Sequence, residues 1–266
     1  MMNELQQTEF ALLKMFDQVC AKLGLKYFLV CGSALGAAKY QGFIPWDDDI
    51  DVALYRSDYE IFCECAAALL PAHVFVQNFH TDPGFPAIYS KLRDLTAPYV
   101  EKSARNLPIR HGVFIDVFPL DGYPDGWLAR RRLECRKRIY KHALAAAFCL
   151  DRSGGAQLLY LANWVLGTPK RTAQIAQKYT DLICRYPART SGVLCNHGNW
   201  QGILDYAPGE QYGDGVWTMF EGLPVRIPAR YDQYLTQKYG DWRSDPPPEQ
   251  QKGHHDNAAC VPERAL

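Results

Sequence analysis

Apolar residues recur at helical spacing near the start of the chain. Leu5, Leu12, Phe16 and Val19 share one face of a 3.6-residue repeat. Asn3 is followed three residues later by Gln6, which is the pattern of a capping box. The spacing predicts a helix over residues 4–23, ended by glycine 24.

The next hundred residues alternate between short apolar runs and turn-forming residues, a pattern that predicts strands joined by helices and loops. We expect strands at residues 27–31, 49–54, 73–77, 87–93 and 113–118, and helices at residues 34–40 and 57–70.

The character of the sequence changes after residue 125, where long charged stretches rich in alanine and leucine predict three helices up to residue 186. Short strands are expected again after Pro187, including a hairpin at 216–227, and then a last helix at 229–239. We therefore divide the chain into a core at 1–124, a helical insertion or subdomain at 125–190, and a C-terminal segment at 191–266 that packs back on the core.

Composition indicates a globular protein: 48% of the 266 residues are apolar, and 29 basic residues balance 29 acidic ones. No global charge favours a nucleic-acid partner, and none is expected. The nine cysteines include no CxxC pair, so we predict no zinc site; Cys195 and His197 lack a second pair of ligands. Free thiols and the lack of a signal-peptide pattern favour a cytoplasmic location.

Seven basic residues and one acidic residue occupy residues 128–142. Such a charge run on a helix is usually a solvated face. The alternative is peripheral contact with an anionic membrane surface, such as the inner face of a bacterial membrane.

An acidic run from Asp47 to Asp51 is the first candidate for chemistry. In an extended strand Asp49 and Asp51 project to the same side, where two carboxylates can share Mg²⁺ together with substrate phosphates. Asp47 is assigned to the phosphate-binding loop. A solvated acidic turn is the alternative interpretation.

Gly32 and Ser33 stand at the end of the preceding strand, sixteen residues before Asp49. A glycine permits close approach of the backbone to a phosphate, and the N–H groups at a helix start and a serine hydroxyl can donate to its oxygens. The pair alone would be an ordinary turn; together with the acidic strand it predicts a phosphate site.

The stretch GSALGAAKYQGFIPWDDDIDVALYRSDYEIF at 32–62 resembles the LicD family of bacterial phosphocholine transferases, which is related to fukutin and fukutin-related protein. Further similar segments are YSKLRDLTAPY at 89–99, FIDVFPLDG at 114–122 and the C-terminal region at 220–255. The resemblance covers most of the chain and is weakest over 125–190.

This resemblance implies an α+β, nucleotidyltransferase-like fold, in which a mixed sheet is flanked by helices. It also implies a third carboxylate on a later strand, matched by Asp116, so that Asp49, Asp51 and Asp116 are the expected catalytic and metal-binding residues. A buried hydrogen-bonded anchor is the other interpretation of Asp116. Asp121 is expected to cap a loop.

Members of the family are understood to move a phosphoryl-alcohol, such as phosphocholine or a phospho-alditol, from a CDP-activated donor to a glycan hydroxyl, with release of CMP. The implied cofactor is Mg²⁺ or Mn²⁺. Lys91 and Arg93 lie two residues apart in a predicted strand, hence on one face, and are expected to contact phosphate. His254 and His255 match a place where the family commonly keeps histidine, and they are assigned to phosphate binding as well.

Three alternatives remain open from the sequence. A nucleotidyltransferase would use the same turn and carboxylates to move NMP from an NTP. A DxD glycosyltransferase is disfavoured by the Gly-Ser turn, and a non-catalytic nucleotide- or glycan-binding module would not need three carboxylates.

Overall fold

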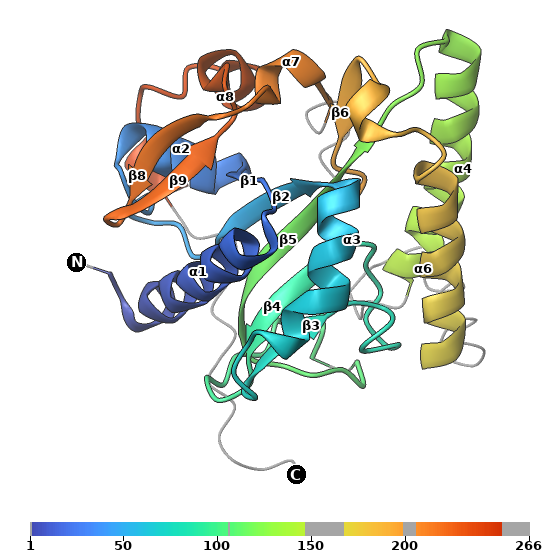
Figure 1. Cartoon of the computed structure of the whole chain (residues 1–266), viewed down its shortest axis with the longest axis horizontal. Helices are drawn as coiled ribbons and strands as arrows, with labels where there is room; N and C mark the ends of the chain where they lie inside the picture. Colours follow the sequence, from blue (N-terminus) through green and yellow to red (C-terminus); the bar gives the residue numbers. More distant parts are fainter. Residues whose placement is uncertain (1, 106, 147–167, 199–205, 252–266) are drawn as a thin grey trace.

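The structure is a computed structural model that describes residues 2–105, 107–146, 168–198 and 206–251. Within these ranges a mixed sheet of seven strands forms the centre, and a separate two-stranded hairpin packs beside it (Figure 1). The predicted α+β class is therefore confirmed. No helix in the described ranges is long and apolar enough to cross a membrane.

The path of the sheet runs β1-β2-β5-β4-β3, with β6 and β7 added at the far end of β5. Its main strands are β1 (Tyr27–Leu29), β2 (Asp51–Tyr55), β3 (Val74–Gln77), β4 (Ser90–Asp94) and β5 (Val113–Gly122). β2 and β5 are parallel, whereas β1 and β4 run antiparallel to their neighbours. All ten residues of β5 are buried, and this strand has a partner on both edges.

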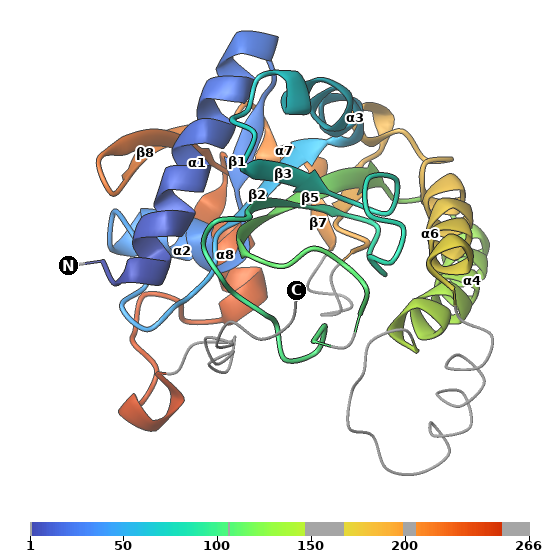
Figure 2. The ribbon, with the colours of Figure 1, turned by 90° about the horizontal axis from the view of Figure 1, so that it is seen from below.

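Two helices cover one face of this sheet: α1 (Glu4–Leu23) and α3 (Arg56–Cys65), as Figures 1 and 2 show. The capping box at Asn3 is present in the structure, and Gly24 adopts the left-handed conformation that ends α1. The apolar face of α1, including Leu13 and Phe16, is fully buried in the main core.

The C-terminal segment extends the sheet from β5 with two strands and packs a hairpin beside β1. It contains β6 (Val193–Cys195), β7 (Tyr206–Pro208), α7 (Gly209–Tyr212), β8 (Val216–Phe220), β9 (Leu223–Ile227) and α8 (Tyr231–Tyr239). The predicted hairpin is confirmed as β8 and β9, and the last helix ends at Gly240 as expected. Buried residues of this segment, among them Phe220 and Leu235, belong to the same core as α1 and β5.

Helices α4 (Trp127–Ala145) and α6 (Pro169–Ile183) lie side by side at the rim of the molecule (Figures 1 and 2). They pack around a second apolar cluster, in which Leu133 and Leu144 of α4 meet Tyr179 and Ile183 of α6. The residues between these two helices lie largely outside the described ranges.

Candidate functional site

Strand pairing places three of the predicted site residues in one row across the sheet. Asp51 of β2 is paired with Asp116 of β5, and Asp116 is paired in turn with Lys91 of β4. Directly paired residues present their side chains on the same face of a sheet. The ammonium of Lys91 lies 3.2 Å from the nearer carboxylate oxygen of Asp116.

The row faces away from α1 and α3. The hydroxyl of Ser90 bonds to Tyr59 of α3, so the adjacent Lys91 must point to the opposite face. The connection between β4 and β5 lies on that side of the sheet in Figure 2. Glu101 comes from this connection and bonds Lys91 at 2.9 Å.

Glu101 is a site residue that the sequence analysis missed. It accepts hydrogen bonds from both Lys91 and Arg93, the latter at 2.7 Å. Burial by itself would raise the pKa of Glu101, but the two cations outweigh burial and lower this pKa to about 2. The signal in the sequence was indirect: two basic residues in an otherwise buried strand require a counter-charge.

Arg93 is completely buried, and its guanidinium is occupied by the protein. Besides Glu101, it donates to the carbonyl of Gly112 at 2.7 Å and to the side chain of Gln77. The predicted shared face of Lys91 and Arg93 is present, since both reach Glu101. In this arrangement Arg93 orients Glu101, and Lys91 is the cation beside the carboxylates.

Gly32 and Ser33 lie in the first turn of α2 (Cys31–Lys39), which begins three residues earlier than the sequence predicted. The hydroxyl of Ser33 accepts a hydrogen bond of 2.8 Å from the N–H of Asp51. A Cβ atom on Gly32 would lie only 2.7 Å from a carboxylate oxygen of Asp47. The two residues therefore connect the start of α2 to both ends of the acidic run.

The sequence predicted that the second strand begins at residue 49, but it begins at Asp51. The N–H of Asp51 donates to the hydroxyl of Ser33 instead of to a strand neighbour. Asp49 thus precedes the strand, and the strand pleat does not place it beside Asp51. The charge of Asp49 nevertheless acts on Asp51: burial first, and then the charges of Asp49, Asp116 and Asp47, raise the pKa of Asp51 well above its ordinary value.

Glu9 of α1 is a second carboxylate that the sequence analysis missed. It is 3% exposed, and burial raises its pKa well above its ordinary value, helped by Asp49, Asp48, Asp47 and Asp116. One turn earlier, the side-chain amide of Gln6 donates to the carbonyl of Asp47 at 2.9 Å. Helix α1 therefore contacts the acidic run directly, through the hydrogen bond from Gln6 to Asp47.

These carboxylates suit a divalent cation that also binds a substrate phosphate. Their negative charges repel, and each therefore raises the pKa of its neighbours. A bound cation would relieve this repulsion. Among the described residues no three His, Cys, Asp or Glu side chains are arranged to hold a metal ion by themselves. Mg²⁺ usually takes one or two protein carboxylates and completes its shell with water and phosphate oxygens.

Two further expectations have different outcomes. Asp121 does not cap a loop: β5 extends to Gly122 through its pairing with β6, and Asp121 is buried in a two-bond ion pair with Arg56, at 2.8 and 2.7 Å. His254 and His255 lie outside the described residues.

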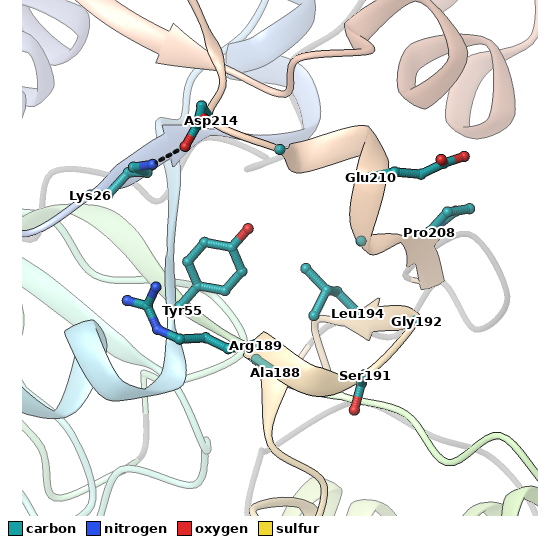
Figure 3. Close-up of a pocket in the computed structure, with 12 residues that line it drawn as sticks. Lys26, Tyr55, Ala188, Arg189, Ser191, Gly192, Leu194, Pro208, Glu210 and Asp214 are labelled. Carbon is teal, nitrogen blue, oxygen red and sulfur yellow. Dashed lines mark hydrogen bonds and ion pairs between the residues drawn. The ribbon is translucent and has the colours of Figure 1, made fainter.

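An open groove of about 620 Å³ lies at the other end of β2 (Figure 3). Tyr55 ends that strand and contacts Arg189, while Lys26 and Asp214 form an ion pair of 2.6 Å at one side of the groove. The strand separates Tyr55 from Asp51 by roughly 13 Å at about 3.3 Å per residue. None of the predicted site residues within the described ranges lines the groove, so it is separate from the carboxylate row.

A mixed sheet with a Gly-Ser helix start and carboxylates on two adjacent parallel strands defines the nucleotidyltransferase-like class expected from the sequence. Residues 24–138 match the family described as "LicD/FKTN/FKRP, nucleotidyltransferase domain". This range holds all the site residues described above except Glu9.

Similarity extends well beyond that domain. The chain is 29% identical to the lipopolysaccharide cholinephosphotransferase LicD of Haemophilus influenzae, over 98% of both chains. Two uncharacterized proteins, from Rickettsia prowazekii and Rickettsia typhi, are 37% identical over 49 residues, which is 18% of this chain and 18% and 16% of theirs. The resemblance to the LicD family that the sequence motifs indicated is therefore confirmed over nearly the whole chain.

Proposed function

We propose that this protein transfers a phosphoryl-alcohol, of the phosphocholine or phospho-alditol type, from a CDP-activated donor to a hydroxyl of a cell-surface glycan or its precursor. The observation that carries the proposal is the row of Asp51, Asp116 and Lys91 across three adjacent strands. The similarity to a lipopolysaccharide cholinephosphotransferase over nearly the whole chain supports the choice of phosphocholine and glycan.

In the proposed reaction the acceptor hydroxyl oxygen bonds to the phosphorus that carries the alcohol. The bond from that phosphorus to the bridging oxygen breaks, and CMP leaves with the electron pair. Asp116 is placed to take the hydroxyl proton, because it lies in the middle of the row. The ammonium of Lys91 offsets the negative charge that develops on the phosphoryl oxygens.

Asp49 and Asp51 are the residues proposed to hold Mg²⁺ or Mn²⁺, together with oxygens of the substrate phosphates. Asp116, which was also expected in the metal site, is proposed to accept the proton instead. Such an ion, when bound, would neutralise the pyrophosphate and so make CMP a better leaving group. Gly32 and Ser33 contribute the start of α2, whose N–H groups suit a phosphate. Asp47 lies against this turn, since a Cβ atom added to Gly32 would fall 2.7 Å from its carboxylate, and it is proposed to orient the turn.

We propose that the enzyme acts in the cytoplasm at the inner face of the membrane, where precursors of surface glycans are accessible. The basic helix α4 supports this location.

The test is to incubate the purified protein with Mg²⁺ and, in parallel, CDP-choline, CDP-ribitol, CTP or a UDP-sugar, and to identify the nucleotide released. CMP from a CDP-alcohol supports the proposal. Release of pyrophosphate from CTP or of UDP from the sugar donor, without CMP, would overturn it and favour one of the other transferase classes.

The roles of individual residues are tested with matched aspartate variants. Asp51→Asn should lower the rate of CMP release about a hundredfold or more while leaving the circular dichroism spectrum unchanged. Asp214→Asn removes a carboxylate at the far end of the sheet, in an exposed pair with Lys26, and should keep full activity. Full activity of Asp51→Asn would refute the proposed role.

A further inference from the structure

The outer face of α4 carries an apolar stripe that faces solvent. Leu128 and Ile139 are 48% and 68% exposed, and the exposed Cys135 lies between them. Spacings of seven and four residues place these three side chains on one line along a helix. Trp127, beside the start of the stripe, is 73% exposed.

Arginines border this stripe on both sides. At 100° per residue, Arg131 and Arg138 lie on one side of it, while Arg132 and Arg136 lie on the other. All four are exposed, and none of them forms an ion pair with a residue in the described ranges. The stripe and these four arginines are called the outer face of α4 below.

Two other basic residues of the helix serve the fold and are distinct from the outer face. Lys137 is buried, with hydrogen bonds to Glu134 at 2.9 Å and to the hydroxyl of Tyr206 at 2.6 Å. Arg130 donates to the carbonyl of Pro124 and lies over the ring of Tyr123. The inner face packs on α6, so the outer face is left at the rim of the molecule (Figures 1 and 2).

From this geometry we infer that the outer face of α4 binds an anionic membrane surface, with Leu128, Ile139 and Trp127 in the interfacial layer and the four arginines at lipid phosphates. Helices that lie in a membrane interface combine an apolar stripe with flanking cations and interfacial tryptophan. A second copy of this chain is a poor occupant, because two outer faces would bring arginines against arginines. A nucleic acid would leave the exposed apolar stripe without a partner.

The inference names the surface of the protein that contacts the membrane at the proposed location, and in that respect it rests on the proposed function. Membrane binding needs no donor or turnover, however, so its failure would leave the proposed phosphotransfer untouched. Sedimentation of the full chain is therefore measured at low salt, with vesicles of phosphatidylcholine and phosphatidylglycerol and with vesicles of phosphatidylcholine alone.

We expect binding to the anionic vesicles only. Arg132→Gln/Arg136→Gln should weaken the partition coefficient about tenfold or more, whereas Lys14→Gln/Lys22→Gln, which removes two exposed cations from α1, should not change it. Leu128→Ser/Ile139→Ser should also weaken binding, and more of this effect should remain at high salt.

Tryptophan fluorescence gives an independent readout of the same contact. Anionic vesicles should shift the emission of the wild type to shorter wavelength, and the shift should be lost in Trp127→Phe. The inference is overturned if the anionic vesicles do not sediment the protein, if the α1 variant loses as much binding as the α4 variant, or if the two apolar substitutions change nothing. Binding of RNA in place of vesicles would also overturn it.

Discussion

Glu101 is the residue whose removal tests the site most sharply, because it holds both Lys91 and Arg93 in place. The perturbation is Glu101→Gln, which keeps the shape of the side chain but removes its charge. Lys91 retains Asp116 at 3.2 Å as a partner. Arg93 is completely buried and loses the carboxylate that balances its charge.

The magnitude follows from the lowered pKa of Glu101. A fall from the ordinary 4.5 to about 2 corresponds to roughly 3 kcal/mol of stabilisation at neutral pH, at about 1.4 kcal/mol per pKa unit. Breaking a buried ion pair by removing one partner typically costs about 3–5 kcal/mol, which is consistent with the value from the pKa of Glu101. We therefore expect Glu101→Gln to destabilise the protein by about 3 kcal/mol at pH 7.

The pH dependence gives the prediction a sign. The pKa of Glu101 is lower in the folded state than in the unfolded state, so its stabilisation is complete above pH 4.5 and is lost as the pH falls towards 2. The difference in unfolding free energy between wild type and variant should shrink over that interval.

Urea unfolding followed by tryptophan fluorescence, repeated from pH 7 down to the lowest pH at which the protein folds, measures this difference. Asp214→Asn, in the exposed pair with Lys26, serves as the control and should unfold like the wild type. A Glu101→Gln penalty below about 1 kcal/mol at pH 7, or a penalty that is independent of pH, would refute the reasoning.

The remaining predictions concern the surroundings of the acidic run. Glu9→Gln should raise the urea midpoint in EDTA at pH 8 and have no effect at pH 4, because the folded-state pKa of Glu9 is raised and its charge is therefore destabilising; a lower midpoint at pH 8 would contradict this. Gly32→Ala should fold normally but lower the rate of CMP release about tenfold, because the added Cβ would lie 2.7 Å from a carboxylate oxygen of Asp47 and would displace it; unchanged turnover would count against a role for the position of the Asp47 carboxylate. Ser33→Ala should cost about 1–3 kcal/mol in urea unfolding, because the N–H of Asp51 loses its acceptor; a neutral result would mean that another acceptor replaces the hydroxyl.

Local patterns predicted the elements well where they depend on neighbours in the chain. The capping box at Asn3 and the left-handed Gly24 are set by a few consecutive residues, and both are present. The pairing of Asp51 with Asp116 depends on a parallel contact between segments 65 residues apart, so it could be expected only through family resemblance. The start of β2 was predicted two residues early, because the hydrogen bond from Asp51 to Ser33 cannot be seen in the alternation of polar and apolar residues.

The sequence by itself determined the chemical inventory of the site: a glycine and a serine before a run of aspartates, and two basic residues in a buried strand. It did so because these residue types are unusual where apolar neighbours are expected. Only the tertiary structure decided which charges form ion pairs. Arg93 pairs with Glu101, and Lys91 pairs with both Glu101 and Asp116. The physical reason is that a buried charge must find a partner in space, and that partner can come from any part of the chain.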